Sequence, residues 1–128
     1  MHAVICDDDL SDLDQMRSLV EVCSSELGLC MEIQCFSDPA KAFAHINETD
    51  CDILFTDIYM NDTDGVGMVR ILRSQHPGLA VIFVTVSEER ALDAFRVNAV
   101  QYLLKPVRKE DVLNALALIT NKKIPGVS

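Results

Sequence analysis

The sequence predicts an α/β protein: a doubly wound, five-stranded parallel sheet with strand order 2-1-3-4-5, flanked by five helices. Five short runs rich in Val, Ile and Phe recur roughly every 20 to 30 residues, and each is too short to be a helix. Most of these runs are apolar on both faces, which is typical of strands buried inside a parallel sheet. The stretches between them carry helical spacing, so strands and helices alternate, which implies right-handed βαβ crossovers.

The apolar runs define the expected strands, which are residues 3–6, 31–36, 53–56, 80–85 and 101–104. Apolar stripes at helical spacing lie in three of the connecting or following stretches. They run from Leu10 to Leu27, from Val66 to Leu72, and from Val112 to Ile119. Each stripe predicts a helix that packs one face against the sheet.

Residues that begin and end helices stand at the expected boundaries. We expect Asp9 or Ser11 to cap the first helix and Gly28 to end it. Ser37-Asp38-Pro39 offers a cap followed by proline in the first turn of the second helix. Further on, the segment 76–78 (His-Pro-Gly) is expected to end the third helix before the fourth strand.

The composition narrows the class of protein. The net charge is −9, with 11 Lys and Arg against 20 Asp and Glu, so we do not expect the chain to bind nucleic acid by itself. No apolar run is long enough to span a bilayer, and the first residues carry no signal-peptide pattern. We therefore expect a soluble, cytoplasmic protein with no membrane partner.

The five cysteines are expected to be reduced thiols of the core, because their number is odd, no C-x-x-C pair occurs and they lie within apolar runs. They are Cys6, Cys23, Cys30, Cys35 and Cys51. No histidine stands near a cysteine at the spacing of zinc ligands, so a zinc site is not expected.

Polar groups follow four of the five strands. Asp7 and Asp8 follow the first strand, Asp57 the third and Lys105 the fifth, while Thr85 ends the fourth. The carboxyl ends of parallel strands form the ligand-binding edge of such a sheet, so these groups are expected to meet. Clustered carboxylates repel one another unless a cation joins them, and magnesium (Mg2+) prefers such oxygen ligands. With a lysine and a hydroxyl nearby, the set is suited to accept and stabilise a phosphoryl group on a carboxylate.

The chain resembles the receiver domains of two-component response regulators over essentially its whole length. The motifs that carry the resemblance are VICDDD at 4–9, DILFTDIYM at 52–60, DG at 64–65, VIFVT at 81–85 and YLLKP at 102–106. The resemblance implies a flavodoxin-like fold, a receiver domain over residues 1–121 and a sensor histidine kinase as the partner. It also implies a phosphoacceptor that assists its own phosphotransfer and dephosphorylation, rather than an enzyme.

The resemblance also implies roles for single residues. Asp57 is expected to accept the phosphoryl group and Lys105 to contact it. Asp8, Asp57 and the backbone carbonyl of Tyr59 are expected to bind Mg2+ directly, with Asp7 acting mainly through water. Two further expectations are that Thr85 and Tyr102 form the switch pair and that the peptide bond between Lys105 and Pro106 is cis.

Within the family, residues 94–106 (AFRVNAVQYLLKP) look like the LytR/AlgR subgroup, whose receivers usually precede a LytTR-type DNA-binding domain. No such domain is present, so DNA would be bound only through a domain that this chain lacks. Residues 122–128 lose periodicity and are expected to be a linker or the cut end of a longer chain. A homodimer formed on phosphorylation is also expected.

Several positions depart from the family pattern. Asn61 replaces the usual proline four residues after the phosphoacceptor, which predicts a more polar and more mobile loop. Val86 follows the switch threonine, where a smaller residue is common. We hypothesise that Tyr59 shields the acyl phosphate from water; an unchanged phosphoryl half-life in Tyr59→Asn would contradict this.

Other functions are compatible with parts of the pattern. A haloacid-dehalogenase-type phosphatase also uses a strand-end aspartate and magnesium, but it needs a second acid where this chain has Tyr59. A pseudo-receiver that acts as an interaction module without phosphate normally lacks one of Asp8, Asp57 or Lys105, and all three are present here. A stand-alone single-domain regulator also remains an alternative.

Overall fold

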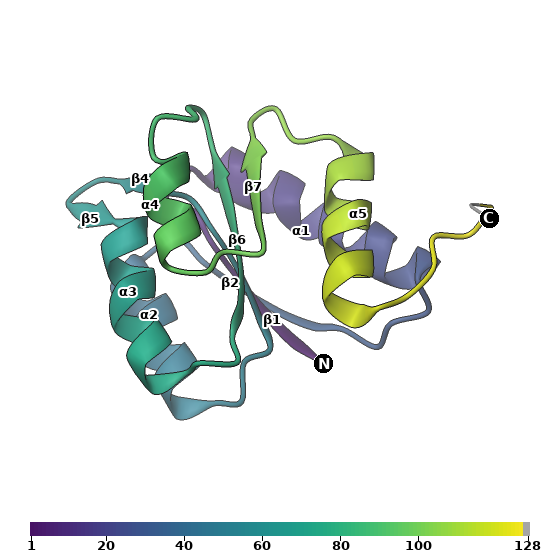
Figure 1. The fold of residues 1–128 in the computed structure, drawn as a ribbon, viewed down its shortest axis with the longest axis horizontal. Coiled ribbons are helices and arrows are strands. Elements are labelled where there is room, and N and C mark those ends of the chain that lie inside the picture. Colours follow the sequence, from purple (N-terminus) through teal and green to yellow (C-terminus); the bar gives the residue numbers. More distant parts are fainter. Residues whose placement is uncertain (127–128) are drawn as a thin grey trace.

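A computed structural model describes residues 1–126 and has the predicted architecture (Figure 1). Five parallel strands form one sheet in the order β2-β1-β3-β6-β7, which is the predicted order 2-1-3-4-5 once the two short strands β4 and β5 are set aside. The elements are β1 (His2–Cys6), α1 (Leu10–Glu26), β2 (Glu32–Phe36), α2 (Pro39–Glu48), β3 (Ile53–Thr56), β4 (Tyr59–Met60), β5 (Thr63–Asp64), α3 (Gly65–Gln75), β6 (Ala80–Thr85), α4 (Ala91–Arg96), β7 (Gln101–Leu104) and α5 (Lys109–Thr120).

The central strands are buried because helices cover both faces of the sheet. All four residues of β3 are buried, and successive residues point to opposite faces: Phe55 joins one core cluster and Leu54 the other. This explains why a continuous apolar run marks the strand. The two edge strands are less covered: no residue of β2 is fully buried, and of β7 only Leu103 is.

The two faces carry separate hydrophobic cores. Helices α1 and α5 pack on one face, and α2, α3 and α4 on the other (Figure 1). On the first face Val20 of α1 and Leu116 of α5 are completely buried, and on the second Ile46 of α2 and Leu72 of α3 are. The helical stripes seen in the sequence are the buried faces of these helices.

Three helices that begin near the carboxyl edge of the sheet are capped by aspartates. Asp9, Asp38 and Asp64 precede α1, α2 and α3, and each accepts a backbone N–H of the first turn. The predicted capping by Asp9 is confirmed. Gly28, expected to end the first helix, follows α1 with a φ of +67°, in the left-handed region that glycine tolerates.

The loop after β3 contains a short antiparallel pair that the sequence did not indicate. Strands β4 and β5 pair Tyr59 with Asp64 and Met60 with Thr63. Asn61 lies between them with a φ of +40°, a conformation that asparagine adopts more readily than most residues. The expected polar loop is therefore a hairpin in this structure.

The cysteine prediction needs a correction. All five thiols are free, but only Cys6 and Cys23 are buried, while Cys30 is exposed. Cys30 lies in the connection between α1 and β2, where no strand or helix covers it. The prediction failed because Cys30 lies in a connecting segment and not in the strand core that the apolar run suggested.

Residues beyond α5 are described as far as residue 126. Asn121 ends α5 with a φ of 56°, and Ile124 packs against the core cluster shared by α1 and α5. The last part of the segment predicted as a linker, residues 127–128, lies outside the described residues. No helix within residues 1–126 is long and apolar enough to cross a membrane.

Candidate functional site

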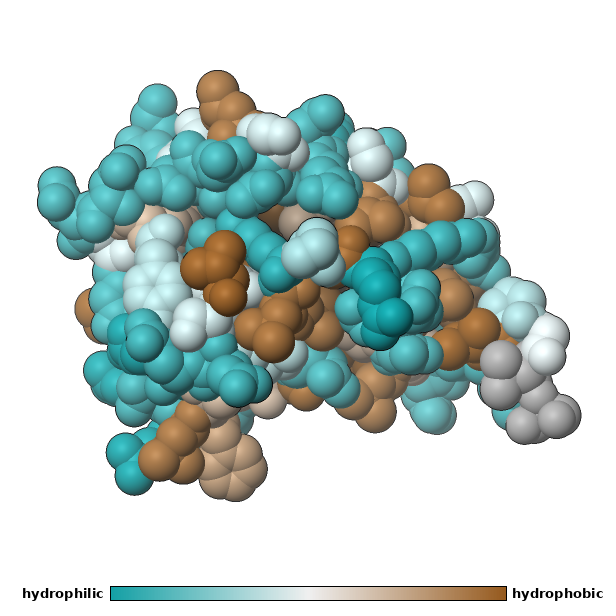
Figure 2. Space-filling view, turned by 90° about the horizontal axis from the view of Figure 1, so that it is seen from above, coloured by the Kyte–Doolittle hydropathy of each residue, from teal (hydrophilic) through white to brown (hydrophobic). Residues whose placement is uncertain are grey.

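The strand ends bring the predicted polar groups together at one edge of the sheet. Cys6 of β1 pairs with Thr56 of β3, so Asp7 and Asp57 follow neighbouring strands at the same level. Thr85 pairs with the last residue of β7, and Lys105 comes next. Viewed from above (Figure 2), this edge is mostly hydrophilic, with isolated hydrophobic side chains standing out from it.

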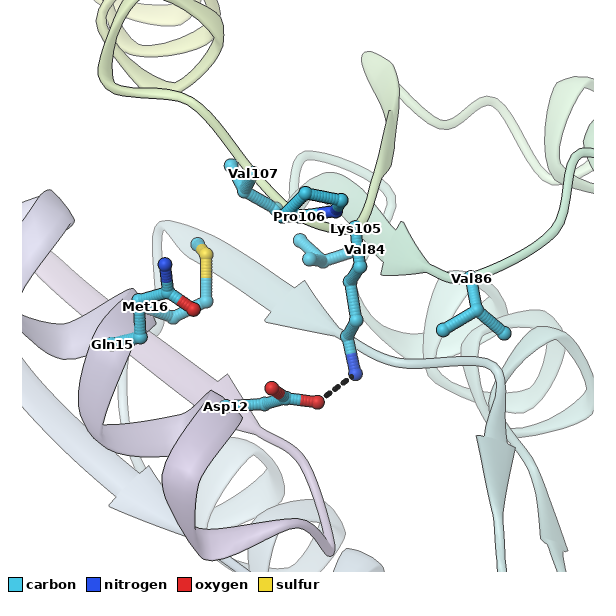
Figure 3. Close-up of a pocket in the computed structure, with 8 residues that line it drawn as sticks. All are labelled: Asp12, Gln15, Met16, Val84, Val86, Lys105, Pro106 and Val107. Atoms are coloured by element: carbon cyan, nitrogen blue, oxygen red, sulfur yellow. Dashed lines mark hydrogen bonds and ion pairs between the residues drawn. The ribbon is translucent and has the colours of Figure 1, made fainter.

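Lys105 is the centre of the site. Its Nζ donates to Oδ2 of Asp7 at 2.8 Å, to Oδ2 of Asp12 at 2.8 Å and to Oδ2 of Asp57 at 2.9 Å. The peptide bond between Lys105 and Pro106 is cis, as predicted. Figure 3 shows the lysine side chain extending from the end of β7 toward Asp12 on α1. One ammonium group therefore joins carboxylates from two strand ends and one helix.

Asp57 is held by hydrogen bonds on both oxygens. Oδ1 accepts the backbone N–H of Ile58 at 2.6 Å and of Tyr59 at 3.3 Å, while Oδ2 accepts from Lys105. Its side chain is only 8% exposed. The carboxylate is therefore oriented by the loop that follows it and is almost completely buried.

Burial and pairing act in opposite directions on the charges of the site. Burial raises the pKa of Asp7, and the hydrogen bond from Lys105 only partly offsets this. Burial alone would lower the pKa of Lys105, but the hydrogen bonds to Asp12, Asp7 and Asp57 hold it above its ordinary value. The lysine therefore stays charged at neutral pH.

The predicted switch residues lie beside the acidic cluster. Thr85 is completely buried, and its hydroxyl has no hydrogen-bond partner within residues 1–126. Tyr102 is partly buried, packs near Phe83 at a ring-centroid distance of 6.4 Å, and donates its hydroxyl to the carbonyl of Ser87 at 2.5 Å. Burying a hydroxyl without a hydrogen-bond partner costs free energy, so a new acceptor near Thr85 would be bound favourably.

Two contacts connect the loop after Asp57 with the loop after Thr85. The Tyr59 hydroxyl donates to the Glu89 carboxylate, which raises the pKa of Tyr59 to about 12. Arg90 donates two hydrogen bonds to Asp64, at 3.0 and 3.2 Å. Partial burial would raise the pKa of Asp64, but these bonds bring it below its usual value. The two loops beside Asp57 are thus tied together by side chains.

Asp12 is the site residue that the sequence did not reveal. It lies in the first turn of α1 and binds Lys105, 93 positions along the chain. The only available signal was that α1 begins at the same edge of the sheet as the strand-end aspartates. A motif based on strand ends does not include a helix residue, so Asp12 was missed.

The oxygen donors at this edge suit magnesium. The carboxylate of Asp8 is half-buried, follows Asp7 directly, and has no hydrogen bond or ion pair within residues 1–126. Asp8, Asp57 and a backbone carbonyl would supply two carboxylates and one neutral oxygen, as magnesium prefers. Among the described residues no group of three or more His, Cys, Asp or Glu has metal-holding geometry, so the fit rests on two carboxylates.

The fold and the strand-end site define a receiver domain, and the comparisons with known proteins agree. Residues 3–117 match the family model of the response regulator receiver domain. The chain therefore belongs to the receiver-domain family of two-component response regulators.

Among individual relatives, the chain is similar to the sensory transduction protein LytT of Bacillus cereus, with 28% identity over 123 residues, or 96% of this chain and 48% of that protein. It is 42% identical over 80 residues to the positive alginate biosynthesis regulatory protein of Pseudomonas aeruginosa, covering 62% of this chain and 32% of that one. The chain thus spans about half the length or less of these curated relatives. Both support the predicted similarity to LytTR-type regulators.

Solved structures show the same fold. The response regulatory domain of protein mrkE from Klebsiella pneumoniae superimposes with a TM-score of 0.84 at 24% identity, covering 94% of this chain and 96% of that one. The isolated receiver domain of RcsB from Salmonella enterica, solved in the presence of the phosphomimetic beryllofluoride, gives a TM-score of 0.80 at 22% identity, covering 98% and 94% of the two chains.

Proposed function

We propose that this chain is a phosphoacceptor that takes a phosphoryl group from a sensor histidine kinase onto Asp57. The observation that carries the proposal is the Asp57 carboxylate, oriented by two backbone N–H groups and joined to Lys105 at the ends of neighbouring strands. Receiver-domain membership supports the same chemistry. The site is then a phosphorylation site that assists its own reaction, rather than an enzyme active site for a separate substrate.

In the proposed reaction an Asp57 oxygen attacks the phosphorus in line with the bond to the donor. The new O–P bond forms an acyl phosphate, and the electron pair of the broken N–P bond returns to the donor histidine. Lys105 neutralises charge on the transferring phosphoryl oxygens. Bound magnesium, held by Asp8, Asp57 and the Tyr59 carbonyl, would supply further charge neutralisation. Asp7 would act beside it through water.

Thr85 and Tyr102 are proposed to transmit the reaction to the surface. The Thr85 hydroxyl, which lacks a partner in the described residues, would donate to a phosphoryl oxygen. Tyr102 would then leave the Ser87 carbonyl and turn inward, shifting the population between two states of the face formed by α4, β7 and α5. Such a shift would change the surface offered to partners and favour a homodimer.

The output of the whole regulator is also a proposal. The similarity to LytTR-type regulators favours control of transcription in the cytoplasm through a DNA-binding domain outside this chain. A stand-alone regulator and a phosphorylation-independent interaction module are the alternatives. The intact set of Asp8, Asp57 and Lys105 favours phosphorylation over the interaction module.

Beryllofluoride with magnesium tests the proposal, since it imitates a phosphoryl group on an aspartate. We expect amide NMR signals around Asp57, Thr85 and Tyr102 to shift in the wild type, and Asp57→Ala to abolish the response. Tyr102→Ala should still bind but lose the shifts in α4 and α5. A wild type without any response, or an equal response in Asp57→Ala, would refute the proposed site.

A further inference from the structure

The Lys105 ammonium has no donor left for a phosphoryl group. A lysine ammonium carries three N–H donors. In this structure three carboxylates, those of Asp7, Asp12 and Asp57, lie at hydrogen-bond distance from Nζ. A phosphoryl oxygen that arrives at Asp57 must therefore displace one of the carboxylates before Lys105 can bind it.

The partners differ in how readily they can be released. The side chain of Asp7 is 4% exposed, and its other oxygen accepts the backbone N–H of Asp9 at 3.0 Å. The side chain of Asp12 is 35% exposed, and within residues 1–126 its carboxylate contacts only Lys105. Releasing a buried carboxylate without a partner is costly, whereas water can solvate Asp12. Asp57 stays at the site because it carries the phosphoryl group. Of the other two partners, Asp12 is therefore the exchangeable one.

There is also room for Asp12 to move. A cavity of about 300 Å³ lies beside it, between the start of α1 and the ends of β6 and β7. Figure 3 shows the Lys105–Asp12 pair spanning this opening, with Gln15 and Met16 on the helix side and Val86 beyond the lysine. Asp12 can leave Lys105 through a side-chain rotation, without a shift of the sheet.

We propose that Asp12 is a positioning residue that holds Lys105 in the resting state and competes with the phosphoryl group for it. This inference rests on the proposed phosphorylation of Asp57. Asp12 also adds a negative charge to a site that already contains Asp7, Asp8 and Asp57, and so repels an incoming phosphoryl dianion. Asp12 thereby lowers the reactivity of the resting site.

Asp12→Asn tests the proposal, because the amide keeps the size of the side chain and removes its charge. Asp14→Asn is the matched control: Asp14 is exposed on the same helix, and no contact joins it to Lys105 in the described part of the chain. We expect the affinity of Asp12→Asn for beryllofluoride to be about two- to fivefold higher than that of the wild type. Its rate of phosphorylation by acetyl phosphate should rise by about the same factor. Asp14→Asn should match the wild type, and Asp12→Glu should return toward it.

A second measurement does not depend on phosphorylation. The NMR signal of the Lys105 ammonium in the resting protein should shift in Asp12→Asn and stay in place in Asp14→Asn. An unchanged signal, or equal beryllofluoride affinity in the two variants, would overturn the role of Asp12. If the wild type binds no beryllofluoride, the proposed function and the competition fail together, and the ammonium signal then shows whether the resting contact itself exists.

Discussion

At the scale of single residues, most of the polar side chains discussed around Asp57 already form hydrogen bonds. Lys105 joins three carboxylates, Tyr59 donates to Glu89, and Tyr102 donates to the Ser87 carbonyl. Thr85 is the exception, since its buried hydroxyl lacks a partner in residues 1–126. In the resting state these side chains are therefore held by hydrogen bonds, whereas the Thr85 hydroxyl is free to donate to a new acceptor.

The Tyr59–Glu89 contact leads to a prediction about pH. The Glu89 carboxylate accepts a hydrogen bond from the neutral phenol, which favours the neutral form and raises the pKa of Tyr59 to about 12. Glu89→Gln removes the charged acceptor, so the pKa of Tyr59 should fall toward the ordinary value of about 10. Tyrosinate absorbance in an alkaline titration measures this, and Tyr59→Phe separates its signal from that of Tyr102. A pKa that stays near 12 in Glu89→Gln would mean that the contact does not form in solution.

At the scale of elements, the start of α3 is packed directly against the backbone of Asp57 and Ile58. Gly65 is the first residue of α3, and its N–H donates to the Ile58 carbonyl at 2.8 Å. A Cβ at Gly65 would overlap the backbone oxygen of Asp57 and lie 2.9 Å from Cα of Ile58. The Asp-Gly pair in the sequence therefore reflects a close approach between helix and loop that leaves no room for a side chain.

Gly65→Ala should destabilise the protein, because the loop that orients Asp57 would have to move. We expect a loss of about 1–3 kcal/mol in the free energy of unfolding, as for overpacked core positions. Gly67→Ala is the control two residues on, where a Cβ would make only ordinary contacts with Asp64. It should be neutral or stabilise α3 by up to about 1 kcal/mol. Urea denaturation compares the two, and equal stability of both variants would contradict the packing argument.

At the scale of the whole molecule, the sheet and its helices were predictable because both faces of the sheet are covered. The strands β3, β6 and β7 have the bounds expected from their apolar runs, and the strand order places Asp7 next to Asp57 as predicted. Burial on two faces leaves a continuous apolar run, which is a strong local signal. The strand-end residues of the site follow from the same topology.

Features that depend on contacts between distant segments were not predictable in the same way. The β4–β5 hairpin, the exposure of Cys30 and the Asp12–Lys105 pair have no periodic signal of their own. Each depends on where a loop or a helix turn comes to lie once the sheet is formed. The sequence therefore predicted that Asp57 and its strand-end neighbours lie together, but it did not indicate that Asp12 of α1 binds Lys105.

Covalent phosphorylation tests the central claim most directly. The protein is incubated with magnesium and acetyl phosphate, and its intact mass is measured against a parallel sample of Asp57→Asn and one from which magnesium is removed with EDTA. We predict that the wild type with magnesium gains the mass of one phosphoryl group, while Asp57→Asn and the EDTA sample gain none. No gain in the wild type, or the same gain in Asp57→Asn, would contradict the assignment of Asp57 as the phosphoacceptor.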